Sequence, residues 1–206
     1  DHIRGLLEKC KGCPRSGLDD CAPHPLGTLD TSGHHTCAVV ADGISCWGHN
    51  NAGQVGVFEG TDPAFGTILP DVVLSPTLVA GTSGMVQVTT GGYFTCGRAM
   101  DGTVSCWGQD QFGEVGDGPT DLCYGDATSK PYVPTATKVK NIADAIDVEA
   151  GAFHACTVTS DGAVWCWGFN HSYQCGIDWG SIICDTDAGP TEYLSNYTLA
   201  APQKVP

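Results

Sequence analysis

The sequence predicts an all-β protein built from repeats, and three observations support this prediction. A hairpin-like segment recurs three times, and the tryptophans that close the copies, Trp47, Trp107 and Trp167, are 60 residues apart (107 − 47 and 167 − 107). Each copy has Asp-Gly between two short runs of apolar or β-branched residues, which is a strong signal for a β-hairpin. The 28 glycines and 12 prolines among 206 residues are typical of short strands joined by turns. The fixed period indicates a repeat architecture.

Each copy places one cysteine on either side of its hairpin turn. In the second copy, a three-residue turn at 100–102 puts Cys96 and Cys106 four residues from the loop on each side, so that they face each other at the separation of a disulfide. The third copy keeps this count. The first copy has one residue fewer after its glycine, so we expect a bulge to bring its pair into step. The predicted disulfides are Cys37–Cys46, Cys96–Cys106 and Cys156–Cys166.

Six further cysteines lie outside the hairpins: Cys10, Cys13, Cys21, Cys123, Cys175 and Cys184. Cys175 and Cys184 fall in the same loop region, so we expect them to pair. Cys123 then pairs with one of the three N-terminal cysteines, and the remaining two pair with each other. The spacing of Cys10, Cys13, Cys21 and His24 also resembles a zinc knuckle, although paired cysteines elsewhere favour disulfides here.

The cysteines also suggest a compartment. Twelve cysteines, six of them in opposed hairpin pairs, predict an oxidising environment, and hence a secreted, extracellular protein. The chain opens at Asp1 without an apolar signal segment, as a mature secreted protein would. In such a protein the sequons that begin at Asn170 and Asn196 predict glycosylation.

Charge and hydropathy exclude two classes of partner. The formal net charge of −14 would repel a phosphate backbone, so nucleic acid is not an expected partner. No run approaches the roughly 20 apolar residues of a membrane-spanning helix, so no membrane span is expected.

The chain divides into a cysteine-rich N-terminal cap and three repeats. We expect the cap at residues 1–25 and the repeats at 26–84, 85–144 and 145–206. Repeat folds act through the loops of one face, and the long loops here are residues 57–74, 117–134 and 177–199.

The recurring pattern is specific enough to compare with a known family. Gly-x-x-His/Phe-Thr/Ala-Cys, then Asp-Gly-x-Val-x-Cys-Trp-Gly, Gly-Gln-x-Gly and Pro-x-x-Val resemble the repeat of the regulator of chromosome condensation family, in a cysteine-bearing secreted form. The resemblance covers residues 26–206. It implies a β-propeller in which each repeat supplies a four-stranded blade, with about three blades here where the family usually has seven. It also implies close backbone packing at two sets of glycines: Gly33, Gly91 and Gly151, and Gly48, Gly108 and Gly168. The cysteines, the acidity and the small number of repeats depart from the family.

No residue pattern within the three repeats predicts catalysis or metal binding. His34, His35 and His154 lie beside strand cysteines, but a cysteine in a disulfide has no thiolate to act as a nucleophile. The acids at 117–121 and 185–187 lack the spacing of a calcium loop. The repeating tryptophans are expected to pack between blades rather than to stack on sugars, whereas Trp165 and Trp179 fall outside that register and are better candidates for an exposed contact.

The sequence therefore predicts a non-catalytic, secreted repeat protein without a cofactor, acting as a structural, assembly or protein-binding module. The expected partners are other copies of the chain or another extracellular protein, with a glycan as a further partner. We expect the third repeat to end in a half-blade at residues 201–206, complementary to residues 26–32, so that copies pair head to tail as an oligomer or filament; failing that, the chain is a fragment of a longer propeller. The alternative is an extracellular carbohydrate-binding protein or hydrolase, which would need two carboxylates opposed across a pocket.

Overall fold

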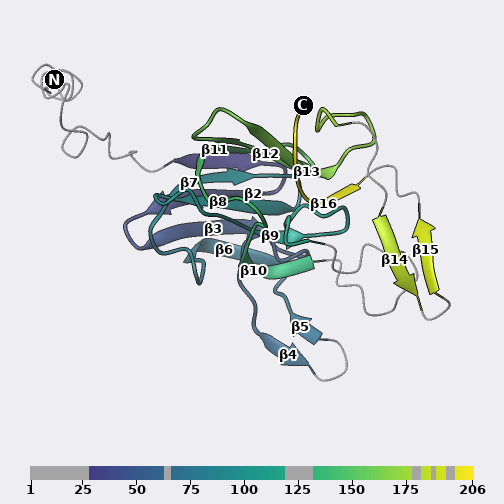
Figure 1. The fold of residues 1–206 in the computed structure, drawn as a ribbon. Helices are drawn as coiled ribbons and strands as arrows, with labels where there is room; N and C mark the ends of the chain where they lie inside the picture. The colour runs from purple at the N-terminus through teal and green to yellow at the C-terminus, as the bar shows by residue number, and fades with distance from the viewer. Residues whose placement is uncertain (1–27, 63–65, 119–131, 178–181, 187–188, 194–197) are drawn as a thin grey trace, which may run out of the picture.

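The computed structural model describes residues 28–62, 66–118, 132–177, 182–186, 189–193 and 198–206 (Figure 1). In this part the chain forms three four-stranded antiparallel sheets and two small outlying hairpins. No helix within these described ranges is long and apolar enough to cross a membrane. The predictions for the N-terminal cap, including both the zinc and the disulfide readings, and those for Cys123, Trp179 and Asn196 fall outside the described residues.

Each sheet is formed by strands in sequence order. The first is β1 (Leu29–Ser32), β2 (His35–Val40), β3 (Gly43–His49) and β6 (Val72–Leu78). The second is β7 (Met85–Thr90), β8 (Phe94–Ala99), β9 (Val104–Gln109) and β10 (Tyr132–Lys138). The third is β11 (Ala145–Ala150), β12 (His154–Thr159), β13 (Val164–Phe169) and β16 (Thr198–Lys204). The prediction of all-β, propeller-like blades is confirmed.

Two long loops carry small hairpins of their own. β4 (Gly60–Asp62) pairs with β5 (Gly66–Ile68), and β14 (Ile182–Thr186) pairs with β15 (Gly189–Tyr193). Both stand apart from the blades in Figure 1.

The cysteine pairs staple the central hairpin of each blade. Cys37 and Cys46, Cys96 and Cys106, and Cys156 and Cys166 are directly opposite one another and are joined by disulfides. The three predicted pairings are therefore confirmed. The prediction of a bulge in the first hairpin is wrong, because the register of this hairpin runs unbroken to Val40↔Gly43. The turn absorbs the missing residue instead, shortening to Ala41 and Asp42.

A glycine after each tryptophan lets the third strand approach the second closely. Gly48, Gly108 and Gly168 have φ values of +112°, +112° and +96°. A Cβ atom on any of them would lie 2.6 Å from a carbonyl oxygen of the preceding strand or its turn. The close packing implied by the family resemblance is confirmed at these positions, and the outer strand shifts its register beside them.

Neighbouring blades share a hydrophobic core centred on one tryptophan. Trp107 is fully buried in a cluster with Ile44, Val55 and Val79 of the first repeat. Trp167 is likewise buried, in a cluster that contains side chains of the second repeat: Phe94, Val104, Val115 and Val139. The interpretation of these two tryptophans as blade-packing residues is confirmed. Trp47, with no preceding blade among the described residues, is only half-buried.

The prediction of complementary half-blades at the two ends of the repeat region is wrong. β1 pairs with β2 along its whole length, from Leu29↔Ala38 to Ser32↔His35. β16 completes the third sheet by pairing with β13, from Trp165↔Lys204 to Phe169↔Thr198. Because each of these strands fills its own sheet, they are not complementary halves of one blade, and head-to-tail strand pairing has no basis in the described residues.

We expect Trp107→Ala and Trp167→Ala to lower the free energy of unfolding by about 3–5 kcal/mol, because each substitution empties a fully buried site between blades. Trp47→Ala is the matched control and should cost clearly less, since its ring is half-buried. Urea denaturation followed by circular dichroism measures the difference. Equal losses in all three variants would contradict this account of the core.

Candidate functional site: an aromatic row at one end of the blades

The three blades present equivalent residue pairs at one end. In each blade, the residue that ends the third strand donates its backbone N–H to the carbonyl of the residue just before the second strand. The pairs are His49 to His34 (2.9 Å), Gln109 to Tyr93 (2.8 Å) and Phe169 to Phe153 (2.7 Å). Because the second strand begins here and the third strand ends here, the hairpin turns lie at the opposite end. All of these side chains except Gln109 carry an aromatic ring or an imidazole.

These rings contact one another across the blade boundaries. The ring centroid of His34 lies 5.8 Å from that of His49 in the same blade. It also lies 5.8 Å from that of Tyr93 in the next blade. Phe112 lies 4.7 Å from Phe169 and 5.9 Å from Phe153. Most of the pairs are tilted or edge-to-face, which suits the ring quadrupoles. We call the following seven residues the aromatic row: His34, His49, Tyr93, Phe112, Phe153, Phe169 and His171.

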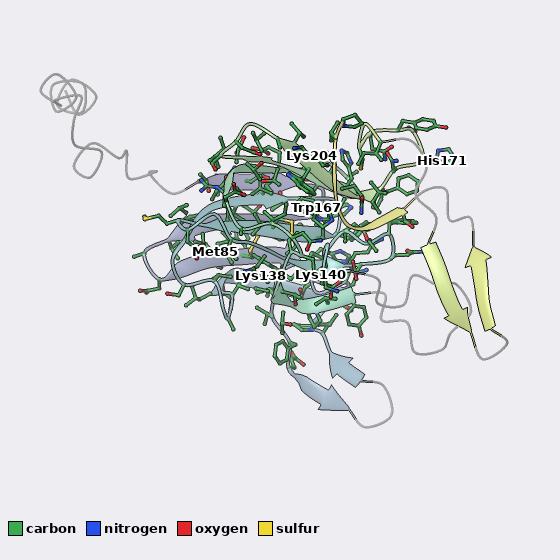
Figure 2. All side chains as sticks on the ribbon, viewed as in Figure 1. Met85, Lys138, Lys140, Trp167, His171 and Lys204 are labelled. Atoms are coloured by element: carbon green, nitrogen blue, oxygen red, sulfur yellow. A yellow bond between two sulfur atoms is a disulfide. The ribbon has the colours of Figure 1, made fainter. Side chains whose placement is uncertain are left out.

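The aromatic row is accessible to solvent. His34 and His171 are exposed, and the other five side chains are half-buried. His171 stacks on Phe169 with an interplanar angle of 5°, and Figure 2 shows it at the opposite end of the blades from Met85.

Backbone hydrogen bonds between blades fix the spacing of the row. Gly92 donates its N–H to the carbonyl of Ala152 at 2.9 Å, next to Tyr93 and Phe153. The Ser32 hydroxyl donates to the carbonyl of Gly91 at 3.2 Å. Tyr93 and Phe153 are therefore held on adjoining backbone of neighbouring blades.

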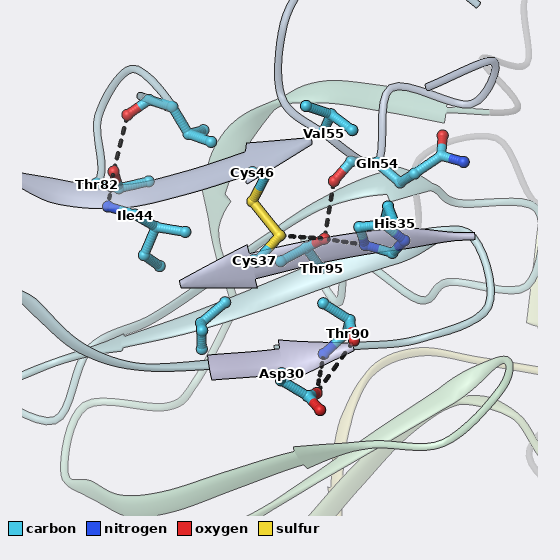
Figure 3. Close-up of a disulfide and its surroundings, with 12 residues drawn as sticks. Asp30, His35, Cys37, Ile44, Cys46, Gln54, Val55, Thr82, Thr90 and Thr95 are labelled. Carbon is cyan, nitrogen blue, oxygen red and sulfur yellow. Dashed lines mark hydrogen bonds between the residues drawn. A yellow bond between two sulfur atoms is a disulfide. The ribbon is translucent and has the colours of Figure 1, made fainter. Parts of the chain in front are cut away.

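A buried polar chain connects the first two blades beneath the row (Figure 3). The Thr95 hydroxyl donates to the carbonyl of Gln54 at 2.8 Å, so His35 Nε2, 2.7 Å away, donates to the Thr95 oxygen. Burial lowers the pKa of His35 to about 4, and its Nδ1 has no hydrogen-bond partner. His35 is therefore neutral at physiological pH and links the two blades through Thr95.

An Asn or Asp after each tryptophan organises the loop that follows. Asn50 Oδ1 accepts from Val55 N at 2.9 Å, and its Nδ2 donates to the carbonyl of Val57 at 2.8 Å. Asn170 makes the same bonds, with Cys175 N and with the carbonyl of Ile177, both at 3.0 Å. In the folded chain the Asn170 amide is 4% exposed and its nitrogen donates within the loop, which disfavours a glycan there, and the glycosylation stays a prediction.

The same loop in the second blade contains two buried acids. Asp110 Oδ1 accepts from Val115 N at 3.0 Å, and Glu114 Oε2 accepts from Phe112 N at 2.7 Å. Burial raises the pKa of Asp110 to about 7 and that of Glu114 to about 8. By accepting these backbone N–H groups, the two acids stabilise the conformation of the loop that carries Phe112 of the aromatic row.

The expected disulfide between Cys175 and Cys184 is absent. Cys175 is a free, buried cysteine whose sulfur points inward, 3.7 Å from the carbonyl oxygen of Phe169 and 3.9 Å from that of Trp167. Cys184 belongs to β14, in the outlying hairpin. Trp165 also differs from its expected role, because it is half-buried and packs against the core between the second and third blades.

The described residues offer no metal centre. No group of three or more His, Cys, Asp or Glu side chains in this part of the chain could hold a metal ion. A depression of about 370 Å³ beside the third hairpin turn is lined by Asp161, Val164, Lys204 and their neighbours. It contains one carboxylate, whereas the hydrolase alternative needs two opposed carboxylates.

The sequence comparisons agree with this architecture. The sequence profile of the Regulator of chromosome condensation (RCC1) repeat matches residues 85–114 and 145–174. Protein pim1 of Schizosaccharomyces pombe is 29% identical over 174 residues, which cover 79% of this chain and 31% of that protein. The guanine nucleotide exchange factor SRM1 of Saccharomyces cerevisiae is 30% identical over 201 residues, covering 89% of this chain and 39% of that protein.

Solved structures extend the likeness to the fold. Yeast RCC1 (Prp20), crystallised with Kap60, superimposes with a TM-score of 0.64 at 25% identity, over 87% of this chain and 36% of that chain. A second structure, of Prp20p from Saccharomyces cerevisiae, gives a TM-score of 0.62 at 24% identity, over 87% and 38% of the two chains.

The described fold and the repeats define a disulfide-stapled β-propeller repeat protein. The chain is an RCC1-like repeat protein. It spans about a third of the length of the relatives and structures named above.

The predicted secreted, extracellular location is contradicted by these relatives, which are intracellular proteins of the nucleus or cytoplasm. The prediction rested on the density and pairing of the cysteines. The cysteines of each pair face each other because of the hairpin register, however, and that register is a property of the blade rather than of the compartment.

No sequence motif indicates that the aromatic row forms one surface. His34 stands out only as a neighbour of a strand cysteine, and no motif marks the phenylalanines. The available signal was positional, since His34, Tyr93 and Phe153 each lie three residues before the first cysteine of their hairpin.

Proposed function

We propose that this chain is a non-catalytic, protein-binding segment of a β-propeller, and that the aromatic row is its contact surface. The observation that carries the proposal is two clusters of accessible rings at the same end of the three blades, one at each blade boundary: His34, His49 and Tyr93, and Phe112, Phe153, Phe169 and His171. The similarity to proteins that bind other proteins supports it, because yeast Prp20 was crystallised with Kap60 and its binding to Gsp1p and histones was studied.

The geometry suits protein recognition. Aromatic side chains are enriched among the residues that dominate binding energy at protein interfaces. Ordering flexible side chains costs free energy on association, and rings that already pack on one another avoid part of that cost. The hydrogen bond from Gly92 to Ala152 keeps the second and third blades in register, so Tyr93 and Phe153 are presented on a fixed frame.

The test begins with a photo-crosslinking amino acid at position 169, in the aromatic row, and in a second protein at position 100. Met100 is 78% exposed at the hairpin turn of the second blade, at the end opposite the row. We expect a partner protein to be cross-linked from position 169 and not from position 100. Cross-linking from position 100 alone, or from neither position, would argue against the proposal.

The cross-linked partner is then purified and its affinity measured by calorimetry. Phe112→Ala and Phe169→Ala should each weaken binding by about 30-fold, as expected for an aromatic residue that contributes about 2 kcal/mol. Met100→Ala is the control and should bind like the unsubstituted protein. Unchanged affinity in both phenylalanine variants would exclude the row as the contact surface.

Self-association is a second candidate, favoured by the uncovered side of the first blade. Trp47 occupies the place of Trp107 and Trp167 but is only half-buried. The nearby outer strand β6 exposes Val72 (50%), Leu74 (91%) and Leu78 (50%). We propose that a blade of a second copy packs on this side, by the same contact that joins blades within the chain.

Light scattering coupled to gel filtration tests the self-association. We expect a concentration-dependent oligomer at micromolar concentrations, which Trp47→Asp should convert to monomer because a charge cannot be buried between blades without a partner. Met100→Asp, at an exposed turn, is the control. A monomer at every concentration, or an oligomer that survives Trp47→Asp, would refute this candidate.

A further inference from the structure

The second blade differs from the other two at two buried positions. In the loop after the tryptophan, the first and third blades have amides, whereas the second has acids of the same size. The equivalent sets are Asn50, Asp110 and Asn170, and Gln54, Glu114 and Gln174. Each set accepts the same type of backbone N–H. The replacement therefore keeps the loop geometry and adds two groups that can ionise.

Asp110 can reproduce the hydrogen bonds of its counterparts only when it is protonated. Asn50 and Asn170 use their Nδ2 atoms to donate to the carbonyl seven residues on, at 2.8 and 3.0 Å. The residue at that position in the second blade is Asp117. A carboxylate has no hydrogen to donate, whereas a carboxylic acid has one.

Glu114 is also better suited to the neutral form. Its side chain is fully buried, and Oε1 has no hydrogen-bond partner. The titratable side chains around the loop are Asp110 and Asp117 within it, Lys140 after β10, whose amine lies beside Gly118, and His171 of the third blade, which stacks on Phe169. None of these is hydrogen-bonded to Oε1, so an ionised Glu114 would be a buried charge without a hydrogen-bonding partner there.

The loop that contains both acids forms the boundary between the second and third blades. The backbone carbonyl of Glu114 accepts the indole N–H of Trp167 at 2.9 Å. Gly118 donates its N–H to the carbonyl of Ala200 at 3.1 Å, and a Cβ atom on Gly113 would lie 2.6 Å from the Cα of Ala200. Loosening of residues 110–118 would therefore loosen the contact between these blades.

We propose that Asp110 and Glu114 form a proton-dependent latch between the second and third blades. When both acids are neutral, the loop at 110–118 closes against Trp167 and Ala200. When they ionise, the loop opens to hydrate the carboxylates, and the blade boundary loosens. Phe112 is carried on this loop, so opening also displaces part of the aromatic row.

The direction of the pH effect follows from the two acids. Burial raises the pKa of Asp110 to about 7 and that of Glu114 to about 8, above their ordinary values of 3.8 and 4.5. At pH values between the ordinary and the raised pKa values, the closed loop binds more protons than the open loop. Closure of the loop therefore takes up protons. The closed form is most favoured below about pH 4, and it loses stability as the pH rises towards 7–8.

Hydrogen exchange of the full chain, read by mass spectrometry, tests the latch. After correction for intrinsic exchange rates, we expect the opening constant of residues 112–116 to rise at least about tenfold between pH 5.5 and 7.5, since each acid contributes up to about tenfold per pH unit. The equivalent residues of the first blade, 52–56, should show no such rise, because Asn50 and Gln54 do not titrate.

Substitutions that exchange acids and amides decide the outcome. The double variant Asp110→Asn, Glu114→Gln should abolish the pH dependence at 112–116, whereas Glu59→Gln, at an exposed position, should preserve it. Gln54→Glu should create a pH dependence at 52–56 in the first blade. A level profile in the unsubstituted protein, an unchanged slope in the double variant, or no effect of Gln54→Glu would each overturn the proposal.

Discussion

The structure depends on the insertion of one tryptophan from a blade into the core of the blade before it. A single four-stranded blade is too thin to bury both of its faces, so its stability comes from stacking on its neighbours. Trp107 and Trp167 perform this stacking, and the chain makes room for them at Gly56 and Gly116, where a Cβ atom would lie about 3 Å from the indole ring (3.0 Å from Nε1 at Gly56, 2.9 Å at Gly116). The loop after each tryptophan, the shared cores and the spacing of the aromatic row all follow from this contact.

The features that the sequence predicted correctly are local or periodic. The 60-residue period and the Asp-Gly turns are visible in the sequence itself. The cysteines face each other because of the strand register within each hairpin. The wrong predictions concerned contacts between distant segments. Cys175 and Cys184 are near in sequence, but one faces the core and the other lies in an outlying hairpin. The burial of the Asn170 amide is also not visible in the sequence, because tertiary structure turns this amide inward.

The candidate site could not be found from sequence because its members come from three blades. No stretch of sequence shows that His34 and Tyr93 touch, and only the stacking of blades brings them together. Asp110 and Glu114 are similarly ordinary in sequence, where acids in a loop suggest a solvated surface. Their burial becomes evident only when the loop is seen against Ala200 and Trp167. The same contact therefore organises the core, the proposed binding surface and the proposed latch.

The solvent accessibility of the individual indole rings tests this account most directly. In the protein labelled with nitrogen-15 at tryptophan, each indole N–H gives one nuclear magnetic resonance signal, and a soluble paramagnetic agent broadens those near solvent. The account predicts that the signals of Trp107 and Trp167 resist broadening, since both rings are 0% exposed, and that the signal of the half-buried Trp47 broadens. If Trp107 and Trp167 broaden as readily as Trp47, the blades are not joined by these rings and the account is wrong.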